Sequence, residues 1–209
     1  GSGKSTLVNL VPRFYDVSSG SIKINGKDIR DYDVLELRDK LGVIPQKAVL
    51  FSGTIADNIR FGKKDASDEE VEYAAKVAQA YPFIMEKENG FDEEISEGAT
   101  NVSGGQKQRL SIARALVRKA QIYIFDDSFS ALDFKTDAIL RKELKKEMTE
   151  SIMLVVAQRI SSIMEADQII VLNEGKVVGK GTHHQLLKEC QIYHEIATSQ
   201  LSEEELANA

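Results

Sequence analysis

Residues 101–109 read Asn-Val-Ser-Gly-Gly-Gln-Lys-Gln-Arg, and an apolar run with helical spacing follows them from Leu110 to Val117. Ser103 is a preferred helix N-cap residue, and two glycines after it leave the free backbone N–H groups open to a ligand. The positive end of the helix dipole adds to these donors, so the segment is typical of an anion-binding helix start. Alone, Ser-Gly-Gly would more often be an ordinary N-cap, so the rest of the chain has to decide.

A second glycine-rich segment opens the chain. It fits the last half of the phosphate-loop pattern G-x-x-x-x-G-K-[ST] and consists of Gly1, Ser2, Gly3, Lys4, Ser5 and Thr6. In this pattern backbone N–H groups surround phosphate oxygens, Lys4 reaches the β- and γ-phosphates, and the Ser5 hydroxyl binds Mg²⁺. We expect a helix after it, with Leu7, Val8, Leu10 and Val11 inward and an end or kink at Pro12.

An acidic pair follows the continuous apolar strand predicted at Ile122–Phe125. A carboxylate at such a strand end, here Asp126, can hold Mg²⁺ through water, which is the Walker B role in phosphate-loop enzymes. The alternative for Asp126 is a helix N-cap. The order of phosphate loop, Ser-Gly-Gly-Gln and acidic strand end resembles the ATP-binding cassette (ABC) family, whose signature motif is Leu-Ser-Gly-Gly-Gln.

This resemblance implies roles for further residues. Ser103, Gly104, Gly105 and Gln106 would bind the ATP of a second domain, and Gln46 would be the Q-loop ligand of Mg²⁺ and water. Ser130–Asp133 would be the D-loop, which touches the opposite site, and Glu97 fits the cross-linking loop of exporters. Phe51 would anchor coupling helices of a transmembrane domain, although an ordinary core phenylalanine is the alternative.

Two catalytic positions depart from the family pattern. Asp127 stands where these ATPases usually have the glutamate that polarises water, and its side chain is shorter by about 1.5 Å, a displacement that can cost on the order of 10²-fold in rate. Gln158 replaces the usual histidine and cannot become cationic near pH 7. The pair resembles the degenerate site of heterodimeric exporters. Compensating movement of Asp127, or a helix-capping role for it, is the alternative.

The predicted fold is α/β, a P-loop NTPase (RecA-like) core with an inserted ABC helical subdomain. Strands at Leu41–Ile44, Ile122–Phe125, Ile152–Ala157 and Gln168–Leu172 alternate with helices, which favours a parallel sheet with ligands at its carboxyl edge. The expected parts are residues 1–46, the helical 47–117, and 118–209. The strands that should precede the phosphate loop are missing, which we interpret as a fragment with an incomplete pocket.

Composition limits the possible partners. The 209 residues carry a net charge of −6 and one cysteine, Cys190, so nucleic acid is an unexpected partner and no internal disulfide can form. No apolar run reaches the ~20 residues needed to cross a bilayer. The resemblance to ABC exporters implies a setting at the cytoplasmic face of a membrane, reached through a transmembrane domain outside this chain, with ATP and Mg²⁺ as ligands.

The functional alternatives stay open at this point. The first interpretation is the motor domain of a heterodimeric ABC exporter, whose second nucleotide-binding domain is a different subunit. A homodimeric exporter, a nucleotide-gated module that rarely hydrolyses ATP, and a soluble ABC protein of DNA repair or translation are the others. The transported substrate is not specified by the sequence.

Several local predictions concern structure alone. Asn25-Gly26 predicts a hairpin turn between Ser21–Ile24 and Lys27–Ile29, and Ser67 with Glu70 predicts a capping box before a helix whose Val71, Ala74, Ala75 and Ala78 point inward. Asn173–Gly175 should turn the last sheet strand back into Lys176–Val178. We expect His183 and His184 to be exposed or capping before one amphipathic helix, Cys190 to be buried or idle, and the tail from Ser199 to Ala209 to fray.

Overall fold

A three-stranded parallel sheet forms the centre of the computed structural model, which describes residues 2–202 and 206. Its order is β3 (Leu41–Ile44), β6 (Ile122–Asp126) and β7 (Ile152–Val156), with β6 in the middle. Continuous apolar sequences suit such strands because both faces of a parallel sheet are covered. The predicted α/β fold with a parallel sheet is confirmed, but the predicted strand Gln168–Leu172 lies outside this sheet, in a separate antiparallel pair.

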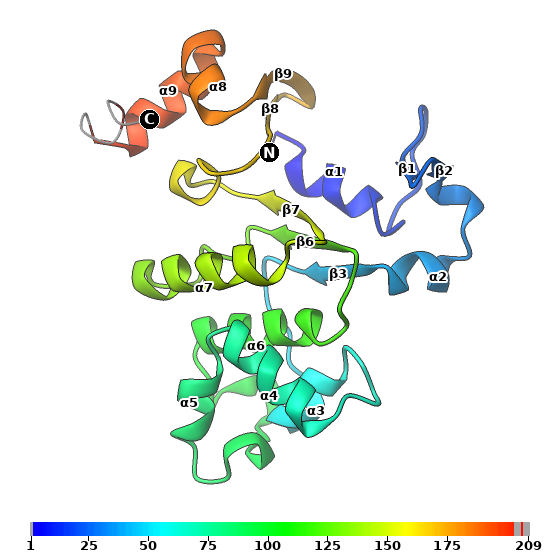
Figure 1. Cartoon of the computed structure of the whole chain (residues 1–209), viewed down its shortest axis with the longest axis vertical. Helices are drawn as coiled ribbons and strands as arrows, with labels where there is room; N and C mark the ends of the chain where they lie inside the picture. Colours follow the sequence, from blue (N-terminus) through cyan, green and yellow to red (C-terminus); the bar gives the residue numbers. More distant parts are fainter. Residues whose placement is uncertain (1, 203–205, 207–209) are drawn as a thin grey trace.

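The two faces of this sheet belong to different hydrophobic clusters. Tyr123 and Phe125 pack into the larger one with α6 (Gly104–Leu116), whereas Ile122 and Ile124 pack into the smaller one with Val8 and Val11. Successive strand residues point to opposite faces, which explains the division. Figure 1 shows α1 (Lys4–Leu10) on one side of the sheet, with α6 and α7 (Phe134–Glu147) on the other.

The region between β3 and β6 is mostly helical, as predicted. It contains β4 (Gly53–Thr54), α3 (Ile55–Arg60), α4 (Asp68–Val77), α5 (Tyr81–Met85), the 3₁₀ turns η2 (Gly90–Asp92) and η3 (Glu97–Ala99), β5 (Glu94–Ile95) and α6. The Ser67–Glu70 capping box begins α4, and Val71, Ala74, Ala75 and Ala78 are buried, so that prediction is confirmed. The boundaries at residues 46/47 and 117/118 stay predictions.

Smaller elements flank the core. The hairpin β1 (Lys23–Ile24) and β2 (Lys27–Asp28) turns at Asn25 and Gly26, both with positive φ as a type I′ turn requires, and leads to η1 (Ile29–Asp31) and α2 (Val34–Asp39). After β7 come η4 (Ile160–Ser162), the antiparallel pair β8 (Ile169–Asn173) and β9 (Lys176–Gly181), α8 (His183–Glu189) and α9 (Gln191–Gln200). Within the described residues, no helix combines the length and hydropathy that a membrane crossing requires.

Four local predictions need correction. Leu7 is 45% exposed because α1 is covered on only one side, by β6 and β7. The single C-terminal helix is two helices, since Cys190 takes an extended conformation between them. His183 is buried against Tyr193, and only His184 is exposed. Ser199 and Gln200 belong to α9 and do not fray, while residues 203–205 and 207–209 lie outside the described residues. The expected helix end before Pro12 and the buried Cys190 are confirmed.

Candidate functional site

The candidate site lies at the carboxyl edge of the parallel sheet. Ile44 pairs with Phe125, and Asp126 pairs with Val156, so the three strands end side by side. The residues that follow each strand therefore converge there, as expected for ligand sites in open α/β sheets. This register brings together Gln46, Asp126, Asp127 and Gln158, which are far apart in the sequence.

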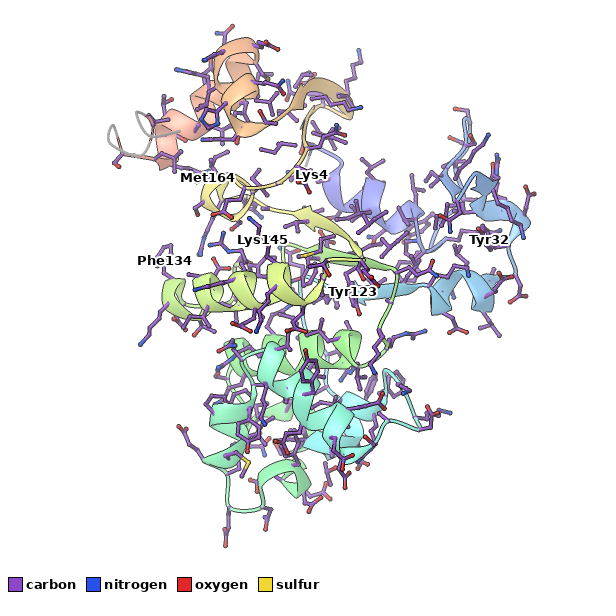
Figure 2. The ribbon with its side chains drawn as sticks, viewed as in Figure 1. Lys4, Tyr32, Tyr123, Phe134, Lys145 and Met164 are labelled. Carbon is purple, nitrogen blue, oxygen red and sulfur yellow. The ribbon has the colours of Figure 1, made fainter. Side chains whose placement is uncertain are left out.

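The predicted phosphate loop reaches the same edge. The Ser5 hydroxyl donates a hydrogen bond to Asp126 Oδ1 over 2.7 Å, although 121 positions separate the two residues. Lys4 Nζ donates to Ser2 Oγ over 2.8 Å and forms no ion pair with any carboxylate of the described residues. Figure 2 labels Lys4 at the start of α1, near β8 and β9. Gly1 lies outside the described residues, and Thr6 is exposed.

The backbone of this loop needs glycine. Gly3 has φ of +91°, a conformation that L side chains rarely adopt, and its neighbour Ser2 accepts a hydrogen bond at its carbonyl from Gly175 N over 3.2 Å. The β8–β9 turn therefore holds the start of the phosphate loop through this backbone hydrogen bond. The turn itself has positive φ at Glu174 and Gly175, which confirms the predicted reversal.

Asp127 is the centre of the hydrogen-bond network. Its carboxylate is buried, and Oδ2 accepts from Gln46 Nε2 at 3.0 Å and from Gln158 Nε2 at 2.7 Å. Of the three residues predicted to be catalytic, Gln46 and Gln158 thus both bind Asp127 directly. Two neutral amides donate to one carboxylate oxygen, so no cationic side chain balances the charge in these contacts.

The backbone of Asp127 is also fixed. Its φ of +50° lies in the left-handed region, which aspartate tolerates better than most residues. Asp127 N donates to Val156 O over 3.0 Å, and its carbonyl accepts from Ser130 Oγ over 2.9 Å. The main chain and the side chain of Asp127 are thus both held by hydrogen bonds.

A cavity of about 350 Å³ borders Asp127 and Gln158. Ser130, at the start of the predicted D-loop, and Arg159 also line it. The Arg159 guanidinium lies 4.9 Å from the centre of the Phe134 ring, which is 76% exposed at the start of α7 and points outward in Figure 2. The site is therefore open on the side of the D-loop and the Gln158 loop.

The Ser-Gly-Gly-Gln segment begins α6 as predicted, but in a separate place. Ser103 and Gln106 form a reciprocal capping box, with hydrogen bonds of 2.9 and 3.2 Å. Gly104 has open space around it, whereas a Cβ on Gly105 would lie 3.3 Å from the carbonyl oxygen of Ala131. Among the described residues, no hydrogen bond joins this segment to the phosphate loop.

Sequence reasoning missed two side chains that connect these parts. Gln108 is buried and donates to Pro45 O over 3.1 Å, which ties α6 to the residue before Gln46. Arg114 donates to Asn58 O, Asn58 Oδ1 and Val49 O over 2.8–2.9 Å, and burial lowers its pKa. The signal that the sequence offered was a polar residue, Gln108 or Arg114, at a position of α6 where the helical spacing predicts an inward-facing side chain.

Arg114 also orders the surface around Phe51. Its guanidinium lies 4.9 Å from the Phe51 ring centre and 5.7 Å from that of Phe61, and these two rings are 4.5 Å apart. Both rings remain substantially exposed, at 44% and 62%. Phe51 is therefore not an ordinary core residue, and its predicted role as an anchor for coupling helices stays a prediction.

The residues present fit a nucleotide with Mg²⁺. Ser5 and Asp126 supply hydroxyl and carboxylate oxygens, the ligand type that Mg²⁺ prefers, and phosphate-bound Mg²⁺ needs only one or two protein ligands beside water. Lys4 and the loop N–H groups supply the positive groups that phosphates require. No cluster of three or more acidic, cysteine or histidine residues suited to a metal ion occurs in the described part of the chain, which leaves these oxygens as the metal ligands we consider.

Comparison with known proteins agrees with this arrangement. The family profile described as ABC transporter matches residues 1–130. An uncharacterized ABC transporter ATP-binding protein of Mycobacterium tuberculosis is 46% identical over 203 residues, 96% of this chain and 34% of its own length. A putative multidrug export ATP-binding/permease protein of Staphylococcus aureus is 44% identical over 200 residues, 96% of this chain and 35% of its own.

A solved structure gives the same result in three dimensions. A bacterial Atm1-family ABC exporter with ATP bound superposes with a TM-score of 0.93 at 39% identity, covering 97% of this chain and 36% of that one. The chain thus spans about a third of the length of these relatives. The profile covers more than half of the chain, and the fold agrees with it. The chain therefore belongs to the ABC transporter family, in which it corresponds to the nucleotide-binding domain.

Proposed function

We propose that this chain is the ATP-binding motor domain of an ABC exporter, which couples ATP binding and hydrolysis to efflux of a substrate across a membrane. The observation that carries the proposal is the meeting of Ser5, Asp126, Gln46, Asp127 and Gln158 at one edge of the sheet. The multidrug-export relative and the ATP-bound exporter structure support the exporter assignment. The substrate is not assigned.

Each residue has a distinct task in this proposal. Gly1, Ser2, Gly3, Lys4, Ser5 and Thr6 bind the phosphates, and Lys4 stabilises negative charge at the γ-phosphate. Ser5, Asp126 and Gln46 would hold Mg²⁺, which supplies charge neutralisation between the β- and γ-phosphates. Asp127, with Gln46 and Gln158, faces the attacking water.

We propose further that this site hydrolyses ATP slowly. Asp127 Oδ2 already accepts two amide hydrogen bonds, and its backbone is held by Val156 and Ser130. Moving the carboxylate toward a water would break these bonds, and Gln158 offers no ionisable group in return. ATP bound here would then act mainly as a clamp between two domains.

The proposed partner is a second nucleotide-binding domain of a different subunit, whose phosphate loop uses Ser103, Gly104, Gly105 and Gln106 of this chain. The separation of this segment from the chain's own phosphate loop supports such head-to-tail pairing. Transmembrane coupling helices would contact the Phe51 surface and place the domain at the cytoplasmic face of the membrane. A homodimeric exporter that tolerates Asp127 and Gln158 is the second candidate, and a non-hydrolysing nucleotide-gated module is the third.

The test compares two adjacent carboxylates in the whole transporter with its partner. Asp126→Asn should abolish retention of radiolabelled ATP at this chain's site because a metal ligand is lost. Asp127→Asn should keep the ATP bound and lower steady-state turnover less than roughly threefold. Neutralising the carboxylate at the corresponding position of the second domain should lower turnover by on the order of 10²-fold or more.

The result would separate the candidates. Equal loss of turnover from the two neutralised positions would show that Asp127 is a working base, as a homodimeric exporter needs. No ATP retention in the unmodified protein would remove the nucleotide-binding role altogether.

A further inference from the structure

The loop that carries Gln158 is held by a side chain from the far end of the chain. Gln200, the last residue of α9, accepts a hydrogen bond at Oε1 from Ile160 N over 2.8 Å. Its Nε2 donates to the carbonyl oxygen of Gln158 over 2.9 Å. The side-chain amide of Gln200 thus binds the carbonyl oxygen of Gln158 and the backbone N–H of Ile160, two main-chain groups that a neighbouring β-strand would otherwise pair with.

The same loop residue makes the key contact of the site on its other side. Gln158 Nε2 donates to Asp127 Oδ2 over 2.7 Å, so its carbonyl is tied to α9 while its side chain is tied to the acidic pair. Fixing the carbonyl limits the rotation of the Gln158 peptide unit. The position of Gln158 Nε2 then depends only on the side-chain rotamer.

Packing supports the hydrogen bonds. Ile160 is 3% exposed and belongs to a hydrophobic cluster that includes Tyr193 and Ala197 of α9. Leu201, directly after Gln200, packs against that cluster. The end of α9 is therefore seated beside the loop and is not free to swing away from it.

A second anchor acts on the next part of the loop. Arg141 of α7 donates to Ser161 O over 2.6 Å and is itself held by both carboxylate oxygens of the buried Asp137. Arg141 therefore fixes the far side of η4, and Gln200 fixes the side next to Gln158. Of the two, Gln200 binds the Gln158 residue directly.

We propose that Gln200 is a positioning residue for Gln158, which makes α9 part of the nucleotide site although it contributes no atom that touches nucleotide. This inference rests on the proposed function of Gln158. It assigns to α9 the task of positioning the Gln158 loop, which the amphipathic sequence of this short helix does not indicate.

The test uses Gln200→Met in the whole transporter with its partner. Methionine matches the length of glutamine but makes neither hydrogen bond. The readouts are the residence time of radiolabelled ATP at this chain's site and the thermal midpoint. We expect the residence time to shorten by roughly fivefold, the size of effect that loss of one or two neutral hydrogen bonds produces, and the midpoint to fall by no more than about 2–4 °C.

Two further variants make the result specific. Gln191→Met removes an amide from the same helix whose one side-chain hydrogen bond within the described residues goes to the exposed Glu195, and it should leave both readouts as they are. Gln158→Ala should shorten the residence time at least as much as Gln200→Met. The double variant Gln158→Ala/Gln200→Met should be no worse than Gln158→Ala alone, since Gln200 acts through Gln158.

The outcomes distinguish the two proposals. If Gln158→Ala shortens the residence time and Gln200→Met does not, the positioning role of Gln200 is wrong while the site assignment stands. Additive effects in the double variant would also overturn it, because Gln200 would then act independently. If Gln158→Ala itself changes nothing, the proposed role of Gln158 in the site fails, and the positioning role fails with it.

Discussion

Asp127 shows how much depends on a single residue of this chain. The sequence identifies it as one methylene shorter than the usual glutamate, and the structure adds that its carboxylate is buried and bonded to Gln46 and Gln158. A flexible, exposed aspartate could move to compensate. This one is held by its side chain and its main chain, which is why we favour the slow-site interpretation.

His183 provides a prediction at the same scale. It is buried, its Nδ1 lies 2.7 Å from the Tyr193 hydroxyl, and its Nε2 has no hydrogen-bond partner in the described residues. Burial, with the neighbouring His184, lowers the pKa of His183 from 6.5, and burial raises the pKa of Tyr193 to about 12. The folded domain therefore keeps His183 neutral where the unfolded chain begins to protonate it.

The sign of the pH dependence follows. Below the unfolded pKa of 6.5 the unfolded state binds more protons, so stability falls as pH decreases, by at most about 1.4 kcal/mol per pH unit, until the folded pKa is reached. Above pH 6.5 the contribution is fully present. After correction for the intrinsic exchange rate, which itself falls as the pH decreases, the opening free energy of β8, β9 and α8 amides in the whole protein should decrease between pH 6.5 and 5.5 and stay constant between pH 7.5 and 6.5.

Matched variants identify the group responsible. His183→Gln should flatten this pH dependence, whereas the exposed His184→Gln should retain most of it. An unchanged pH profile in His183→Gln would show that another group titrates in this range.

At the scale of elements, the contact between α3 and α6 joins the Phe51 surface to the signature helix. Arg114 of α6 binds Asn58 of α3, and Gly62, just beyond α3, lies directly against the same turn of α6. A Cβ on Gly62 would lie 1.9 Å from the Arg114 carbonyl oxygen. Because that obstacle is helix backbone, the two helices would have to move apart.

Gly62→Ala should therefore destabilise the domain by about 1–3 kcal/mol, the usual cost of overpacking. Gly104→Ala is the control, since no atom lies within 4 Å of its Cβ position. The thermal midpoints of the two variants in the absence of nucleotide provide the measurement. A Gly62→Ala midpoint equal to that of Gly104→Ala would mean that α3 can shift away at no cost.

At the scale of the whole molecule, the proposed function gives the chain one part of each of two nucleotide sites: the phosphate loop of its own site, and the Ser103–Gln106 segment for the site of a second domain. In the proposed function, the start of α6 contributes to nucleotide binding through a second domain and not through the phosphate loop of the same chain. A chain that used both parts internally would need contacts between them, and the described residues contain no hydrogen bond of that kind.

Ser103→Arg tests this arrangement in the complete two-domain protein. Arginine places bulk and charge where the γ-phosphate of the partner's ATP should dock, so ATPase activity should fall by on the order of 10²-fold with this chain's own phosphate loop intact. The substitution also removes an N-cap worth about 1 kcal/mol. Ser67→Arg removes the equivalent capping box of α4 and should leave the activity near that of the unmodified protein.

Comparable losses from Ser103→Arg and Ser67→Arg would attribute the effect to helix capping alone. Full activity in Ser103→Arg would contradict the head-to-tail assignment.

The sequence by itself determined the strands of the central sheet, the hairpin turns, the capping box at Ser67 and the helix start at Ser103. These depend on local rules: apolar runs, side-chain caps within three residues, and glycine where φ must be positive. Asp127 and Gln158 stand out for another reason, since the resemblance to the ABC family allows these motif positions to be compared residue by residue.

Only the tertiary structure decided how distant residues share bonds. Contacts of this kind join residues 10 to 81 positions apart in the sequence. Asp127 Oδ2 accepts from both Gln46 and Gln158, and His183 is buried against Tyr193. Arg114 lies over Phe51 and Phe61, and Gln200 binds the Gln158 loop. Such contacts follow from the register of β3, β6 and β7 and from where α9 packs. Those are set by burial of the whole core, which no local pattern encodes.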